Sequence, residues 1–170
     1  MGRDQQAAGK VSAGHVMRPD SRLRSFIAKF SPSDQRRIRA VRAAVRKRFP
    51  TAHELVYDNY NFFVIGYSPT ERPSDSIISI AARANGLGIC FIYGKGLPDP
   101  KNLLQGSGKQ TRFLRVESAS LFKNRDVQAL LTAAIKQSDF PLPRAGRGKL
   151  IIRSVSAKQR PRRRRLRHHS

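Results

Sequence analysis

Hydrophobic residues in the first part of the chain follow a helical spacing. Apolar side chains recur every three or four positions in two stretches, residues 23–30 and residues 31–49. This is the period of an amphipathic α-helix with one face against a core. Ser31 and Pro32 separate the two stretches, because serine caps helix N-termini and proline suits the first helical position. The pattern predicts two helices, the second ending before Pro50.

After the helices, the pattern changes to short runs of β-branched and aromatic residues. Runs of this kind, bounded by turn residues, are typical of strands. Two of them flank the pair Asn85-Gly86, which is a strong short-range signal for a β-hairpin, so we expect antiparallel neighbours at the centre of a sheet. A run whose polar and apolar residues alternate is expected near an edge. The predicted strands are residues 55–57, 62–67, 77–82, 86–93 and the alternating run 111–116.

A last amphipathic pattern covers residues 127–135 and predicts a helix that ends near Ser138. Helices, an antiparallel meander and a final helix make an α+β layer rather than a βαβ repeat. We therefore predict an antiparallel sheet of about five strands packed against N-terminal helices and a C-terminal helix. This domain is placed at residues 21–143, between disordered segments at 1–20 and 144–170. Its expected core includes Ile80, Ile89, Phe91, Leu114 and Leu131.

The chain is strongly basic, and much of its charge lies near the C-terminus. It contains 34 Lys and Arg against 11 Asp and Glu, a formal net charge of +23. Residues 144–170 include eleven of the basic residues and no acid. Apart from residues 150–152, which have the composition of a short strand, this tail has too little apolar surface to order itself. Its candidate contacts to nucleic-acid phosphates are Arg160, Arg162, Arg163, Arg164, Arg165 and Arg167.

The second predicted helix is also basic. Opposite its apolar stripe it carries one acid, Asp34, and seven basic residues. Two interpretations stay open, a solvated outer face and a surface that contacts polyanions. The seven residues are Arg36, Arg37, Arg39, Arg42, Arg46, Lys47 and Arg48.

A glycine-rich connection with several lysines, residues 94–109, is the most distinctive stretch of the chain. It is not a nucleotide-binding P-loop, because that motif needs Gly and Ser or Thr where this chain has Leu103 and Gln110. One interpretation is a pair of turns around a short helix at residues 100–105. The other is a small anion site, and its ligand-binding residues would be Tyr93, Lys95, Lys109 and Arg112.

Aromatic residues gather in and around the predicted strands. One interpretation is a patch on an open sheet face, on which bases or a flat ligand stack. Alternate strand residues point to opposite faces, so about half of the aromatic residues are expected in the core, and core filling is the favoured interpretation. The residues are Tyr57, Tyr60, Phe62, Phe63, Tyr67 and Tyr93.

Residues suited to catalysis or metal binding are few. Cys90 is the single cysteine and lies among apolar strand residues, where a thiol is normally inert. The histidines lie outside the predicted sheet, and the acids are scattered singly. We therefore expect no enzyme, no metal site and no cofactor. No stretch has the apolar length of a secretory signal or a membrane span, so a cytoplasmic protein without membrane contact is expected. The oligomeric state is not indicated.

Several short motifs occur together between residues 23 and 138. An apolar helix ends in Phe-Pro, a strand closes on Phe-Ile-Tyr-Gly, and Leu-Pro-Asp-Pro follows. Leu-Leu-Gln-Gly-Ser-Gly-Lys and Arg-Phe-Leu-Arg-Val come next. In these motifs the chain resembles the YdhG-like domain family. The resemblance implies an α+β fold related in shape to frataxin, with no assigned function for most members and intracellular iron delivery for one branch.

These observations favour a non-catalytic binding or carrier module for a small anionic ligand or a protein partner. The alternative is a nucleic-acid-associated protein that contacts phosphates with its tail and its basic helix. An iron carrier, implied by the family resemblance, is disfavoured. Weakly held ferrous iron needs a ridge of hard oxygen ligands, and the long helix carries arginines instead.

Overall fold

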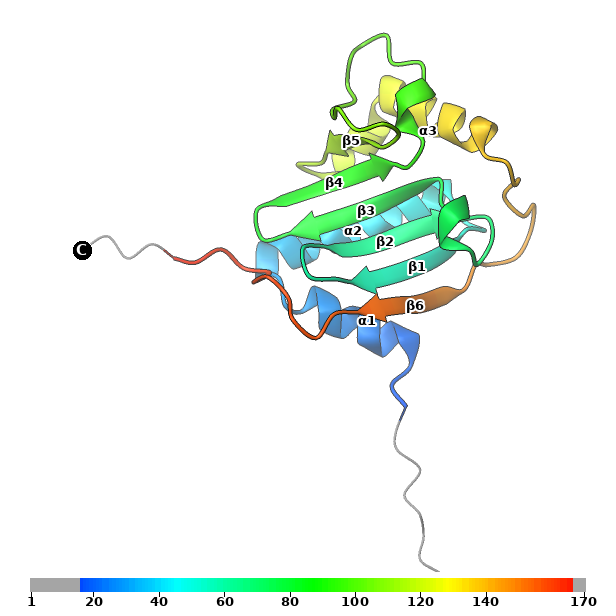
Figure 1. Cartoon of the computed structure of the whole chain (residues 1–170). Helices are drawn as coiled ribbons and strands as arrows, with labels where there is room; N and C mark the ends of the chain where they lie inside the picture. The colour runs from blue at the N-terminus through cyan, green and yellow to red at the C-terminus, as the bar shows by residue number, and fades with distance from the viewer. Residues whose placement is uncertain (1–15, 167–170) are drawn as a thin grey trace, which may run out of the picture.

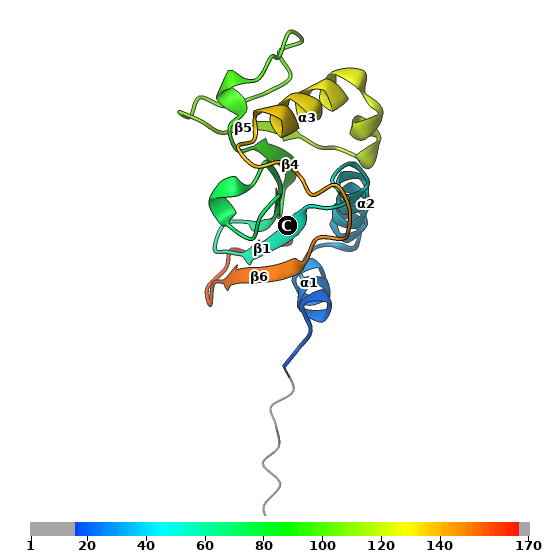
Figure 2. The same ribbon diagram turned by 90° about the vertical axis from the view of Figure 1, so that its right-hand side faces the viewer.

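The computed structural model describes residues 16–166, which form one mixed six-stranded sheet and three α-helices (Figure 1). The helices are α1 (Pro19–Ile27), α2 (Pro32–Arg48) and α3 (Arg125–Gln137). In their order across the sheet, the strands are β5 (Arg112–Arg115), β4 (Gly86–Phe91), β3 (Ile78–Arg83), β2 (Phe63–Ser68), β1 (His53–Asp58) and β6 (Leu150–Val155). Figure 2 shows the three helices on the same side of the sheet. The predicted α+β class is confirmed.

Helix α2 begins and packs as its sequence predicts. The hydroxyl of Ser31 accepts a hydrogen bond from the backbone N–H of Asp34 at 3.2 Å, which caps the helix. Its apolar stripe, Ile38, Val41 and Val45, is buried against the sheet. None of the described helices is long and apolar enough to cross a membrane.

Strands β1 to β5 form the predicted antiparallel meander. β3 and β4 are neighbours, and their turn consists of Ala84 and Asn85, one residue earlier than the Asn-Gly pair predicts, because Arg83 pairs with Gly86. β5 lies at an edge, as expected. The five residues predicted for the core are all buried, namely Ile80, Ile89, Phe91, Leu114 and Leu131.

The predicted disorder of residues 144–170 is not confirmed at residues 150–155, where the short strand suggested by the composition of residues 150–152 is present and extends further. These residues form β6, which pairs in parallel with the outer edge of β1, so that Leu55 lies opposite Ile151. The approach is close, because a Cβ on Gly148 would lie 1.8 Å from the carbonyl oxygen of Ala52. The strand forms because β1 offers unpaired backbone groups that β6 satisfies, and because Leu150 and Ile152 are partly buried against the core. Of the segment predicted to be disordered at 1–20, residues 1–15 lie outside the described residues, and α1 begins at Pro19.

The glycine-rich connection between β4 and β5 does not contain the helix expected at residues 100–105. The Asp99 carboxylate instead accepts hydrogen bonds from the backbone N–H groups of Leu103 and Leu104, at 2.9 and 2.8 Å. Asn102 has a positive φ of 52°, which a helix does not allow. The side chain of Asp99 thus competes with helical hydrogen bonding and holds a turn.

Candidate nucleic-acid interface

Two hairpin turns and the C-terminal segment meet at one end of the sheet. Phe63 pairs with both Asp58 and Ala82, so the β1–β2 turn and the β3–β4 turn lie side by side. β6 ends opposite Asp58, and the chain leaves the sheet from there (Figure 1). We call this region, residues 59–62, 83–86 and 156–166, the hairpin end.

The C-terminal segment is held at the hairpin end by a buried ion pair. Asp58 is fully buried, and its Oδ1 accepts a hydrogen bond from Nη2 of Arg162 at 2.9 Å. The second carboxylate oxygen of Asp58 lies 2.6 Å from Nζ of Lys29. Arg162 itself is 4% exposed and also donates to the carbonyl of Asn59. Buried charges need partners of opposite sign, and each of these cations shares the Asp58 carboxylate.

Further hydrogen bonds, two of them between backbone groups, hold the same segment against the domain. The N–H of Ser156 donates to the carbonyl of Asp58, and the N–H of Arg160 to the carbonyl of Tyr60, each at 2.9 Å. The Nε of Arg163 donates to the carbonyl of Lys29 at 3.2 Å. The segment after β6 is therefore docked on the domain.

The predicted phosphate contacts in the tail divide into three groups. Arg162 points inward and is buried against Asp58, so it does not present its guanidinium at the surface as the prediction requires. Arg167 lies outside the described residues. The other four, Arg160, Arg163, Arg164 and Arg165, are exposed at the hairpin end. The roles of Lys29 and Asp58 were not predicted from the sequence. Asp58 resembles an ordinary turn residue, and its partner Arg162 lies 104 positions further along the chain.

Aromatic residues of the β1–β2 turn divide between surface and core. Tyr60 is 50% exposed and Phe62 is 37% exposed, whereas the next residue, Phe63, is fully buried. The guanidinium of Arg160 lies 5.7 Å from the centre of the Tyr60 ring. The guanidinium of Arg83, a residue that the sequence did not single out, lies 5.5 Å from the centre of the Phe62 ring. Two arginine–aromatic pairs therefore stand at the hairpin end.

Most of the basic residues of α2 have partners within the domain. Arg42 makes two hydrogen bonds to the Glu54 carboxylate, at 2.9 and 2.8 Å, and these raise the pKa of Arg42. Arg46 lies 3.7 Å from the same carboxylate. Arg48 donates to side chains of α3 at 3.1 and 2.8 Å. These contacts give much of the helix a structural role, and its exposed charges include Arg36 and Lys47.

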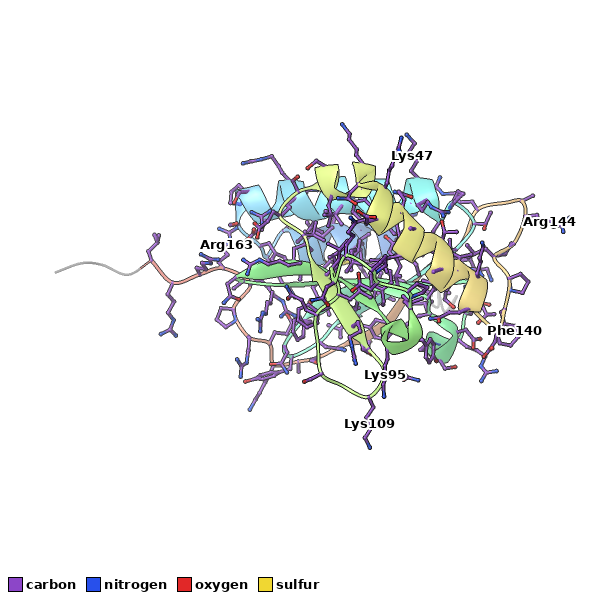
Figure 3. All side chains as sticks on the ribbon, turned by 90° about the horizontal axis from the view of Figure 1, so that it is seen from above. Lys47, Lys95, Lys109, Phe140, Arg144 and Arg163 are labelled. Carbon is purple, nitrogen blue, oxygen red and sulfur yellow. The ribbon has the colours of Figure 1, made fainter. Side chains whose placement is uncertain are left out.

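Three residues of the predicted anion site, Lys95, Lys109 and Arg112, lie at one edge of the sheet, but only the two lysines present their charge to solvent. The N–H of Lys95 donates to the carbonyl of Gln110 at 3.0 Å, and this places the exposed Lys95 and Lys109 side chains at the same edge (Figure 3). Arg112 turns its Nη1 onto the carbonyls of Gly108 and Thr111, at 2.6 and 2.9 Å. The Arg112 guanidinium therefore stabilises the loop that precedes β5.

Tyr93, the fourth residue of that site, belongs to a different environment. Its hydroxyl donates to the carbonyl of Ser74 at 2.7 Å. Its ring lines a cavity of about 280 Å³ that is also lined by Asp75, Asp139 and Phe140. Two carboxylates make this cavity unfavourable for an anion.

A second cavity lies between α1 and α2 and has the opposite charge. Its volume is about 340 Å³, and it is lined by Arg18, Arg24, Arg39, Arg42 and Asp20. The acid Asp20 offsets part of this positive charge. The groove adds to the basic character of the helical face.

Groups for other chemistry are sparse in the described part of the chain. Within residues 16–166, no three His, Cys, Asp or Glu side chains gather as metal ligands do. Cys90 is half-buried on β4, and burial raises the pKa of its thiol above the usual 9.0. A raised pKa lowers the fraction of reactive thiolate.

Comparisons with protein-family models, curated proteins and solved structures find no match to this chain. The resemblance to the YdhG-like family stays a prediction.

Proposed function

We propose that this protein is a non-catalytic module that binds nucleic acid through its hairpin end. The observation that carries the proposal is the buried pair of Arg162 and Asp58, because it holds the arginine-rich segment at one place on the domain. On either side of this anchor, Arg160, Arg163, Arg164 and Arg165 face the solvent beside the partly exposed Lys29. Clustered cations of this kind neutralise phosphates and release counterions.

Charge at the anchor supports this proposal. The carboxylate that contacts the segment, Asp58, is fully buried and already shared by two cations. It therefore does not repel phosphates at the surface as an exposed carboxylate would. Outside the anchor, Arg164 and Arg165 keep their guanidinium groups available at the surface, whereas the exposed Arg163 donates to the carbonyls of Lys29 and Ala28.

The geometry favours nucleic acid over the small anionic ligand that the sequence pattern favours. A compact anion site at the edge of the sheet would need Arg112, and that guanidinium is engaged with backbone carbonyls. The cavity beside Tyr93 is lined by carboxylates. The iron carrier is not supported either, because α2 presents arginines where hard oxygen ligands would be needed.

The test is a salt series with the full chain and fluorescently labelled oligonucleotides, read by anisotropy. Three engaged arginines, Arg160, Arg164 and Arg165, predict a slope of log affinity against log salt of about −2 to −3. The double variant Arg164→Gln/Arg165→Gln should make the slope shallower by about 1.4–1.8, since each lost phosphate contact is worth about 0.7 on single strands and 0.9 on duplex.

The matched control removes two other exposed arginines, Arg144→Gln/Arg147→Gln. Figure 3 shows Arg144 and Arg163 at opposite ends of the molecule. The control has the same net charge as the test variant, and its slope should equal that of the unmodified chain. Equal slopes for both double variants, or no binding at low salt, would overturn the proposal.

A further inference from the structure

The β1–β2 turn presents two aromatic rings that the core does not use. Turns are normally built from Gly, Asn, Asp, Pro and Ser. Here Tyr60 and Phe62 are 50% and 37% exposed, and their neighbour Phe63 alone fills the core position. One exposed aromatic residue on a surface is ordinary. Two of them on a single turn, beside a cluster of arginines, form a surface that is both aromatic and positively charged.

Each ring is paired with a guanidinium from a different part of the chain. Arg160 comes from the C-terminal segment and Arg83 from the end of β3, and they lie 5.7 and 5.5 Å from the ring centres of Tyr60 and Phe62. Aromatic rings and guanidinium planes are the two kinds of side-chain surface on which unpaired bases stack. The hairpin end presents both kinds together.

The turn is held in shape before any ligand arrives. The N–H of Asn59 donates to the carbonyl of Phe62 at 2.9 Å, and the Asn59 side chain accepts from the hydroxyl of Ser154 at 2.7 Å. The Tyr60 carbonyl accepts from the N–H of Arg160. A surface ordered in advance loses less conformational entropy on binding.

From these observations we infer that the hairpin end binds single-stranded nucleic acid, with unpaired bases stacked on Tyr60 and Phe62. The inference rests on the proposed function, which supplies the phosphate contacts. In a duplex the bases are already stacked on one another, so the rings of a turn cannot reach their faces. The exposed arginines can contact the phosphates of either form. Preference for single strands therefore comes from the rings, and the salt dependence comes from the arginines.

The first experiment measures affinity for a labelled 20-nucleotide single strand and for the duplex of the same sequence. Tyr60→Ala or Phe62→Ala should weaken single-strand binding about 5- to 150-fold, the range for loss of one stacked base. Duplex affinity and both salt slopes should be unchanged. Tyr60→Phe should bind as the unmodified chain does, because it keeps the ring. Phe140→Ala, which removes a ring of 43% exposure at the opposite end of the molecule, is the matched control (Figure 3).

A second experiment reports the stacking directly. The chain contains no tryptophan, so Tyr60→Trp introduces a single tryptophan, at the turn. Single strands should quench its emission, and duplex should not, even at a concentration that saturates the phosphate contacts. Thermal melting of each variant checks folding, which exposed turn residues should not disturb.

The outcomes separate the two proposals. If the unmodified chain binds neither form at low salt, both the proposed function and this inference fail. If it binds with the arginine-dependent salt slope but with equal affinity for both forms, and Tyr60→Ala and Phe62→Ala change neither affinity, the function stands and the stacking inference is overturned.

Discussion

Replacing Arg162 by methionine tests whether the C-terminal segment belongs to the folded domain. The Arg162 side chain is 2% exposed and the Asp58 side chain is fully buried, so solvent does not screen the pair. Methionine keeps much of the length of the side chain and removes the charge. The substitution Arg162→Met therefore leaves the Asp58 carboxylate buried with one cation fewer.

The expected cost follows from three contributions. Removing one partner of a buried ion pair costs about 3–5 kcal/mol. Two features lower this figure. Asp58 retains Nζ of Lys29 at 2.6 Å, and the Nε and Nη1 atoms of Arg162 are buried without a hydrogen-bond partner among the described residues. Because removing an unpaired buried donor recovers about 1–3 kcal/mol, the difference between the midpoints of the two ranges gives an expected net destabilisation of about 2 kcal/mol.

The assay is urea unfolding followed by circular dichroism, with thermal melting alongside. In a domain of this size the expected loss lowers Tm by about 5–10 °C. Arg164→Met is the control, since it removes an exposed arginine from the same run. The double variant Asp58→Asn/Arg162→Met should be more stable than the sum of the single effects, by about 0.5–3 kcal/mol. Surface substitutions usually change the free energy of unfolding by no more than about 0.5 kcal/mol. If Arg162→Met differs from the control by no more than this, Arg162 does not anchor the C-terminal segment.

Three further predictions concern the core and the titratable groups. Leu131→Ala, at a fully buried position of α3, should destabilise the domain by about 2–5 kcal/mol in urea unfolding; an unchanged midpoint would contradict its core position. Burial raises the pKa of Cys90, so at pH 8 its alkylation should be slower in the native protein than in urea, and equal rates would contradict this. Burial also raises the pKa of Tyr67 well above 10.0, as does its hydrogen bond to Glu54. The stabilisation that Tyr67 contributes is fully present below pH 10 and is lost as the pH rises further, because the tyrosine of the unfolded chain ionises first. Tyr67→Phe should make this decline in the free energy of unfolding less steep, as measured by urea unfolding between pH 8 and 11.

Much of the fold could be predicted because its signals are local. The cap at Ser31, the apolar stripe of α2 and the alternating run that became β5 each depend on residues within a few positions of one another. The meander could be predicted because neighbouring strands are joined by short turns. The expected α+β layer and its core residues follow from these short-range patterns.

The candidate site depended on contacts that no local pattern encodes. Arg162 lies in a run of four identical residues, and nothing in the run distinguishes the buried one from its exposed neighbours. Tyr60, Phe62 and Phe63 are all aromatic, yet Tyr60 and Phe62 are exposed and Phe63 lies in the core. The prediction of a disordered tail followed from its composition alone.

The sequence by itself determined the helices, the order of the first five strands and the basic character of the protein, because periodicity, capping and charge are properties of neighbouring residues. Tertiary structure alone decided that residues 150–155 complete the sheet and that Arg162 is buried while Arg163, Arg164 and Arg165 face the solvent. The physical reason is that β6 forms on backbone groups of β1, and Arg162 is buried by Asp58, a residue 104 positions earlier. Such pairings become favourable only after the rest of the domain has brought the two segments together.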